Sequence, residues 1–98
     1  MTIDKTLRGD ALTVALTGSL DSVTAPSLEK DLTVSLDGVT SLTIDCAGLK
    51  YVSSAGLRVL LAAHKRLSGQ GGMTLTHVNE TVMDVFEVTG FSTILNIE

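Results

Sequence analysis

Residues 49–61 read LKYVSSAGLRVLL and follow a segment, residues 42–45, in which apolar and polar residues alternate. The alternation predicts a β-strand, and the Leu- and Ala-rich residues after the two serines predict an α-helix from about Ser54 to Ser68. Ser53 and Ser54 therefore fall where a loop becomes a helix. The first amides of a helix lack internal partners, and the helix dipole adds partial positive charge there. A serine at this place can cap those amides, and a phosphate attached to it can be held by them.

Outward from this stretch, strand patterns and helix patterns alternate along the chain. The tight turn at Gly9-Asp10 predicts an antiparallel hairpin, and the later alternation of strands with helices favours parallel pairing. We therefore expect one α/β domain over residues 1–98, with about three helices and a mixed sheet of four or five strands, mostly parallel. Three helices cover one face of such a sheet, which leaves the other face as a candidate interaction surface. Strands are predicted at 2–8, 11–17, 41–45, 73–78 and 91–97, and helices at about 25–36, 54–68 and 80–89.

Short polar and glycine-containing segments predict where the helices begin and end. Residues 18–24 are expected to form a loop, with Thr24 as the N-cap of the first helix and Pro26 in its first turn. Asn79 is expected to cap the last helix and Gly90 to end it.

Composition excludes several classes of function. The chain has 98 residues, of which 44% are hydrophobic and 3% aromatic, with a net charge of −4 and a pI of about 4.9. An acidic chain with few aromatic residues is a poor ligand for nucleic acid. There is no apolar stretch long enough to span a bilayer and no apolar segment behind Met1, so we expect a cytoplasmic protein that binds neither nucleic acid nor membrane. Whether it acts alone or as part of a longer chain stays open. Cys46 is expected to be a small buried residue at the end of a strand.

A catalytic serine is the first alternative to consider. Residues 52–56, VSSAG, match four of the five positions of a G-x-S-x-G nucleophile elbow. No Asp or Glu lies between Ser54 and His77, although His77 ends a strand and can point to the same edge of the sheet. His64 lies about 15 Å further along the same helix. We therefore predict no catalytic residue and no enzymatic activity.

Metal and nucleotide sites find no support either. Two histidines and one cysteine match no zinc-ligand spacing. Residues 69–72, GQGG, lack the lysine of a phosphate-binding loop and follow a helix. His64 beside Lys65 and Arg66 is expected to form a solvated helix end. We predict no metal and no cofactor.

For the two serines, the residues alone leave two interpretations. The simpler is a capping serine followed by a second serine in the first helical turn. The alternative is a modification site, because a phosphate brings about −1.5 to −2 charges to amides that lack acceptors. Such a phosphate would change the surface beside Leu57 and Arg58 without refolding the chain.

Three segments, residues 18–21 (GSLD), 42–61 and 85–91 (VFEVTGF), resemble bacterial STAS domains of the anti-sigma factor antagonist type. The resemblance covers nearly the whole chain. It implies a protein that, when unphosphorylated, binds an anti-sigma factor and so frees a sigma factor for transcription. The implied partner is also a serine-protein kinase with a histidine-kinase-like ATPase fold, which holds the ATP, and a PP2C-type phosphatase reverses the modification.

The resemblance also implies roles for individual residues. The serine two residues before the motif glycine carries the phosphate, here Ser54, with Ser53 as the less favoured acceptor. Asp21 matches an acidic loop residue that supports binding or phosphorylation. Gly56 is expected to allow close approach because it has no side chain. The predicted partner-binding residues are Asp21, Ser22, Thr24, Ser53, Gly56, Leu57 and Arg58.

Two departures from the family pattern bear on these expectations. Many members carry an acidic residue at the position of Ser53, and many add a helix after the position of Glu98. We therefore expect Phe91, Ile94 and Leu95 to close the core. The alternative function is a STAS scaffold or transport-accessory binding module with no phosphorylation cycle.

Overall fold

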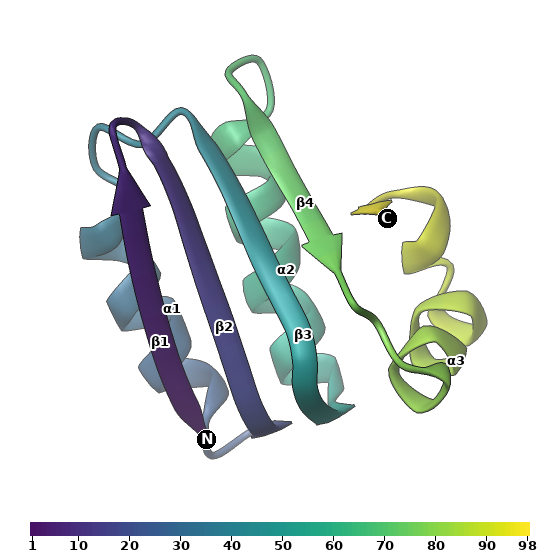
Figure 1. Ribbon diagram of the computed structural model, residues 1–98. Coiled ribbons are helices and arrows are strands. Elements are labelled where there is room, and N and C mark those ends of the chain that lie inside the picture. The colour runs from purple at the N-terminus through teal and green to yellow at the C-terminus, as the bar shows by residue number, and fades with distance from the viewer.

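A five-stranded sheet in the order β1-β2-β3-β4-β5 runs through the computed structural model, which describes all 98 residues (Figure 1). Strands β1 and β2 pair antiparallel, and every other neighbouring pair is parallel. The predicted mixed α/β architecture is therefore confirmed. The strands are β1 (Thr2–Arg8), β2 (Ala11–Leu20), β3 (Ser41–Val52), β4 (Gly72–Thr76) and β5 (Asn96–Ile97); the helices are α1 (Ala25–Ser35), α2 (Ser54–Leu67), α3 (Glu80–Thr89) and the short 3-10 helix η1 (Phe91–Thr93).

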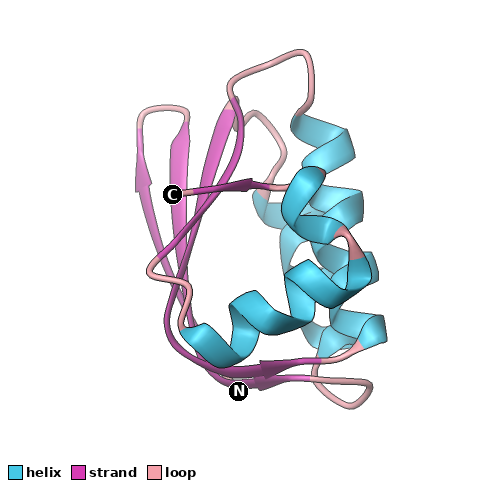
Figure 2. Cartoon of the chain, turned by 90° about the vertical axis from the view of Figure 1, so that its right-hand side faces the viewer, coloured by secondary structure: helices cyan, strands magenta, loops and turns pink.

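All three α-helices lie on one side of the sheet, as expected (Figure 2). Along β2 the inward residues Leu12, Val14 and Leu16 are buried, whereas Thr13 between them is exposed. This period of two places one face of the sheet against the helices and leaves the other open. The core holds 24 buried apolar residues and no buried polar or charged one, so any functional group must lie at the surface.

Strands β2 and β3 are longer than the sequence pattern predicts. β2 continues through residues 18–20, which we expected to form a loop, and β3 continues past Asp45 to Val52. Parallel pairing between the two strands persists to the pair Leu20↔Val52 and absorbs register shifts on the way. The backbone amides and carbonyls of both strands are hydrogen-bonded there. A β-bulge interrupts the alternation of side chains on which the prediction depended. Cys46 is buried inside β3 rather than at its end.

Helix α3 begins and ends where the sequence predicts. The Asn79 side chain accepts a hydrogen bond from the Val82 amide at 2.9 Å, and Gly90 ends α3 with a φ of 81°. The segment after Gly90 forms η1 and the two-residue strand β5 instead of one strand. Leu95 is buried, but Ile94 is 46% exposed, so the prediction that Ile94 closes the core is wrong.

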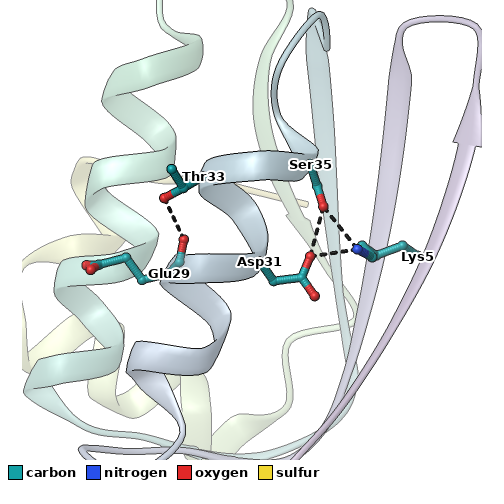
Figure 3. A network of polar contacts seen from close by, with 5 residues as sticks. All are labelled: Lys5, Glu29, Asp31, Thr33 and Ser35. Atoms are coloured by element: carbon teal, nitrogen blue, oxygen red, sulfur yellow. Dashed lines mark hydrogen bonds and ion pairs between the residues drawn. The ribbon is translucent and has the colours of Figure 1, made fainter.

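A small polar network holds the edge strand β1 to α1 (Figure 3). Lys5 Nζ lies 2.7 Å from Asp31 Oδ1 and 3.0 Å from Ser35 Oγ. The Lys5 ammonium holds the pKa of the Asp31 carboxyl below its ordinary value. The network ties β1 to α1 through two residues, Lys5 and Asp31, that are 26 positions apart in the sequence.

Candidate functional site

Ser53 occupies the N-cap position of α2, the one residue between β3 and the helix. Its backbone is extended, with φ −90° and ψ 176°, and its Oγ accepts a hydrogen bond from the Gly56 amide at 3.4 Å. Its own amide donates to the Leu20 carbonyl at 2.8 Å. The half-buried Ser53 is therefore a capping residue that also joins α2 to the end of β2.

Ser54, the first residue of α2, is arranged differently from its neighbour. It is exposed, and its hydroxyl makes no hydrogen bond within the chain. It lies in the first helical turn, where the dipole of α2 favours negative charge. Of the two serines, Ser54 has the hydroxyl that an incoming protein can reach.

The Asp21 side chain caps the turn that leads into the neighbouring helix α1, whose N-cap position is Thr24, as predicted. Its Oδ1 accepts hydrogen bonds from the Val23 and Thr24 amides at 2.9 and 3.0 Å. In return, the Asp21 amide donates to Thr24 Oγ1 at 2.9 Å, which completes a reciprocal capping box. The Thr24 amide and, to a smaller extent, the Val23 amide hold the pKa of the Asp21 carboxyl below its ordinary value. Thr24 occupies the N-cap position of α1 as predicted, but its side chain makes no capping hydrogen bond, because the Thr24 hydroxyl donates to the Ser19 carbonyl.

Both helix starts lie at the same edge of the sheet. Strands β2 and β3 run parallel and end side by side at Leu20 and Val52, so α1 and α2 leave the sheet together. Between them lies a shallow groove of about 310 Å³. Two predicted contact residues, Ser22 from the Asp21 loop and Arg58 from α2, line opposite sides of it. The groove is lined by Ser22, Ala25, Pro26, Glu29, Ala55, Arg58 and Val59.

Two of the predicted partner-binding residues are in the interior. Leu57 is 4% exposed, and Gly56 faces the end of β2. A Cβ on Gly56 would lie 2.7 Å from Leu20 Cγ and 2.8 Å from the Leu20 carbonyl oxygen. The absent side chain lets α2 approach β2, not a partner protein. Gly56 and Leu57, which we predicted to contact a partner, therefore offer no side-chain surface to one.

The nucleophile-elbow alternative fails on distance. His77 Nδ1 lies 3.1 Å from Asp45 Oδ1, so an acid–histidine pair does exist. β4 ends beside Asp45, however, and β3 continues for seven more residues, roughly 23 Å, before Ser53. His77 and Ser54 therefore follow parallel strands that end at different levels, and Ser54 does not complete a catalytic arrangement with this pair.

Other chemistry-bearing side chains are isolated from one another. The Nδ1 of His64 is enclosed with no hydrogen-bond partner and the residue is half-buried, which contradicts the prediction of a solvated helix end for it. Lys65 and Arg66 beside it are exposed, as predicted. No three His, Cys, Asp or Glu side chains converge to form a metal site. None of the helices combines the length and apolar character needed to cross a bilayer.

Comparison with known proteins identifies the family. The model of the STAS domain matches residues 2–98. This chain belongs to the STAS domain family. The STAS domain is 37% identical to the BtrV protein of Bordetella bronchiseptica, over 99% of this chain and 84% of that protein. It is 32% identical to the anti-sigma-B factor antagonist of Listeria monocytogenes, over 91% of this chain and 80% of that protein. The crystal structure of an anti-sigma factor antagonist from Mycobacterium paratuberculosis superposes with a TM-score of 0.86 and 25% identity, over 98% of this chain and 83% of that one.

Sequence reasoning missed part of this surface. Pro26, Glu29 and Ala55 line the groove beside Arg58, although none of them drew attention as a contact residue. Pro26 and Glu29 share one side of α1 with the buried core positions, three residues apart. The helical spacing predicted that this side of α1 faces the core. The residues at the border of that side are the ones that line the groove.

Proposed function

We propose that this STAS domain is an anti-sigma factor antagonist that binds an anti-sigma factor with serine-kinase activity and thereby frees a sigma factor. Phosphorylation of Ser54 ends the binding, and a PP2C-type phosphatase restores it. The exchange takes place in the cytoplasm, with ATP bound to the partner. The observation that carries this proposal is the exposed, unbonded Ser54 hydroxyl in the first turn of α2, in a member of a family whose similar proteins are named anti-sigma factor antagonists.

The geometry of the two serines supports Ser54 as the acceptor. The Ser53 hydroxyl accepts the Gly56 amide, and its residue is half-buried against β2. A kinase that modified Ser53 would remove this cap from the helix. Modification of Ser54 breaks no hydrogen bond, because its hydroxyl has no partner within the chain.

The same geometry supports a docking surface made of two helix starts. Asp21, with its capping contacts, holds Ser22 exposed on one side of the groove, and Arg58 lies on the other. Thr24 contributes by fixing the loop, since its hydroxyl is engaged with Ser19. A phosphate at Ser54 adds about two negative charges beside this surface and three strong acceptor oxygens. A partner shaped for the neutral serine then meets both a larger group and a new charge.

The test combines the protein with its ATP-bound partner kinase and measures mass. One added phosphate is expected on the parent chain and on Ser53→Ala, and none on Ser54→Ala. In a binding assay Ser54→Ala should retain affinity for the partner, whereas Ser54→Asp should weaken it by roughly tenfold or more. If Ser53→Ala alone loses the phosphate, the acceptor is Ser53.

The scaffold alternative makes a different prediction in the same assay. The neutral Ser53, where many family members carry an acidic residue, is the feature that favours it. A scaffold would bind its partner equally well with and without ATP and gain no phosphate. Equal binding of the parent and Ser54→Asp would support the scaffold and refute the switch.

A further inference from the structure

Arg58 is an exposed cation with no partner inside the protein. The two ion pairs of the molecule join Lys5 to Asp31 and His77 to Asp45, so Arg58 belongs to neither. Its side chain borders the groove between α1 and α2. An unpaired guanidinium at this place is free to bind an anion that appears nearby.

Helix geometry directs Arg58 toward Ser54. The two residues are four positions apart on α2, which puts their Cβ atoms about 5–6 Å from each other on one face. Side chains of a helix lean toward its N-terminus, so a long residue covers the turn that precedes its own Cα. For Arg58 that turn begins with Ser54.

We propose that Arg58 is an intramolecular clamp that binds the phosphate on Ser54. The inference rests on the proposed modification of Ser54 and names the residue that converts it into a change at the groove. The planar guanidinium donates two hydrogen bonds to two phosphate oxygens, a geometry that arginine offers and lysine lacks. The order also fits, because an anion four residues before a cation is the favoured arrangement on a helix.

The clamp changes the groove as well as the serine. Glu29 and Arg58 are the only charged residues that line it, one on each helix. Once Arg58 is paired with the phosphate, the charge of Glu29 is no longer balanced across the groove. The partner therefore meets an acidic groove and a phosphate instead of a balanced groove and a hydroxyl. One covalent change thus alters both parts of the docking surface without moving the backbone.

The experiment uses the full chain with phosphoserine inserted at position 54 during translation, so no kinase is needed. The ³¹P signal is followed through a pH titration in the parent and in Arg58→Gln. The titration midpoint should lie roughly half a pH unit lower in the parent, because the clamp favours the doubly charged phosphate. The difference should shrink in 1 M salt, where the Debye length is about 3 Å. Arg58→Lys should give an intermediate midpoint.

Two control variants separate the clamp from a general charge effect. Lys65→Gln removes the same charge from the same helix about 16 Å from Ser54, and its midpoint should equal that of the parent. Lys50→Gln removes the exposed cation of β3 closest in sequence to Ser54, and its midpoint should also match the parent. The Arg58 Nε–Hε signal should shift when Ser54 is replaced by phosphoserine.

Equal midpoints in the parent and Arg58→Gln would overturn the clamp, as would a higher midpoint in Lys50→Gln alone. These outcomes are independent of the proposed function, because the phosphate is inserted genetically. A kinase that fails to modify Ser54 would refute the proposed function and leave this titration unaffected.

Discussion

Two helices start side by side at one edge of the sheet, and their first turns are built in opposite ways. At α1, Asp21 and Thr24 bond to each other's backbone, and the Thr24 hydroxyl is also bonded to Ser19. At α2, one long hydrogen bond from the Gly56 amide to Ser53 provides the side-chain cap, and the next hydroxyl, on Ser54, is unbonded. The first start is closed by its own residues, and the second leaves a polar group available.

The difference shows how one edge of a small domain can hold a fixed loop and also present an accessible hydroxyl group. The α1 start fixes the position of its loop, whereas the α2 start presents a hydroxyl that nothing in the fold requires. A group that stabilises the native state is a poor switch, because changing it costs stability. Ser54 can change without that cost, which is the property a regulatory residue needs.

The largest expected effect comes from the glycine that lets the start of α2 pack against the end of β2. Gly56→Ala should destabilise the protein by about 2–3 kcal/mol, because the added Cβ meets the Leu20 carbonyl oxygen at 2.8 Å. Urea unfolding measures the loss. At a helical position without such a contact the same change stabilises by about 1 kcal/mol, so the sign itself is informative. The control Ala62→Gly, at an exposed position of α2, should cost only that propensity difference. A stable Gly56→Ala would show that α2 and the end of β2 are not in close contact.

The stability that the start of α1 contributes should fall in acid. The lowered pKa of Asp21 means that its contribution to stability is complete above its ordinary value of 3.8 and disappears as the pH falls through the lower, folded-state value. Asp21→Asn keeps an acceptor oxygen but cannot titrate, so its unfolding midpoint should lose less between pH 5 and pH 2 than that of the parent. Asp21→Ala should lower the midpoint at pH 7 as well. Parallel acid profiles for the parent and Asp21→Asn would contradict the role of the charge.

The two serines at the start of α2 should differ in how much each contributes to the stability measured by unfolding. Ser53→Ala removes a cap and should cost about 0.5–1 kcal/mol, the lower part of the usual range because the hydrogen bond is long. Ser54→Ala removes a hydroxyl with no partner and should change stability by less than about 0.5 kcal/mol. Each variant is the matched control of the other. A larger loss for Ser54→Ala would reverse the assignment of cap and free hydroxyl.

The smallest effect is expected far from either start. Lys5→Met removes the ion pair that ties β1 to α1 and should cost about 0.5 kcal/mol, since the Lys5 side chain is 39% exposed and the pair is screened by water and salt. Lys30→Met, which removes an exposed lysine of α1 that has no ion pair, is the control. Equal stability of the two variants would mean that the network of Figure 3 contributes nothing measurable.

Local sequence patterns predicted the order of the elements and the inward residues, because burial on one face enforces the periods of strands and helices. The extension of β3 from Asp45 to Val52 could not be predicted in this way, since it depends on pairing with β2 and on a bulge that disrupts the alternation. The motif located the two serines, but their different roles depend on one hydrogen bond to Gly56. The interior position of Gly56 and Leu57 was missed because a motif shows which residues recur and not which way they face.

The thiol inside β3 has a practical consequence. Burial raises the pKa of Cys46 to about 12 and encloses the only cysteine of the chain in the core. An alkylating reagent can react with it only after the sheet has opened, and the thiolate forms readily only then. Cys46 therefore reports on opening of the core without any substitution. The rate at which iodoacetamide labels it measures how often the native molecule unfolds.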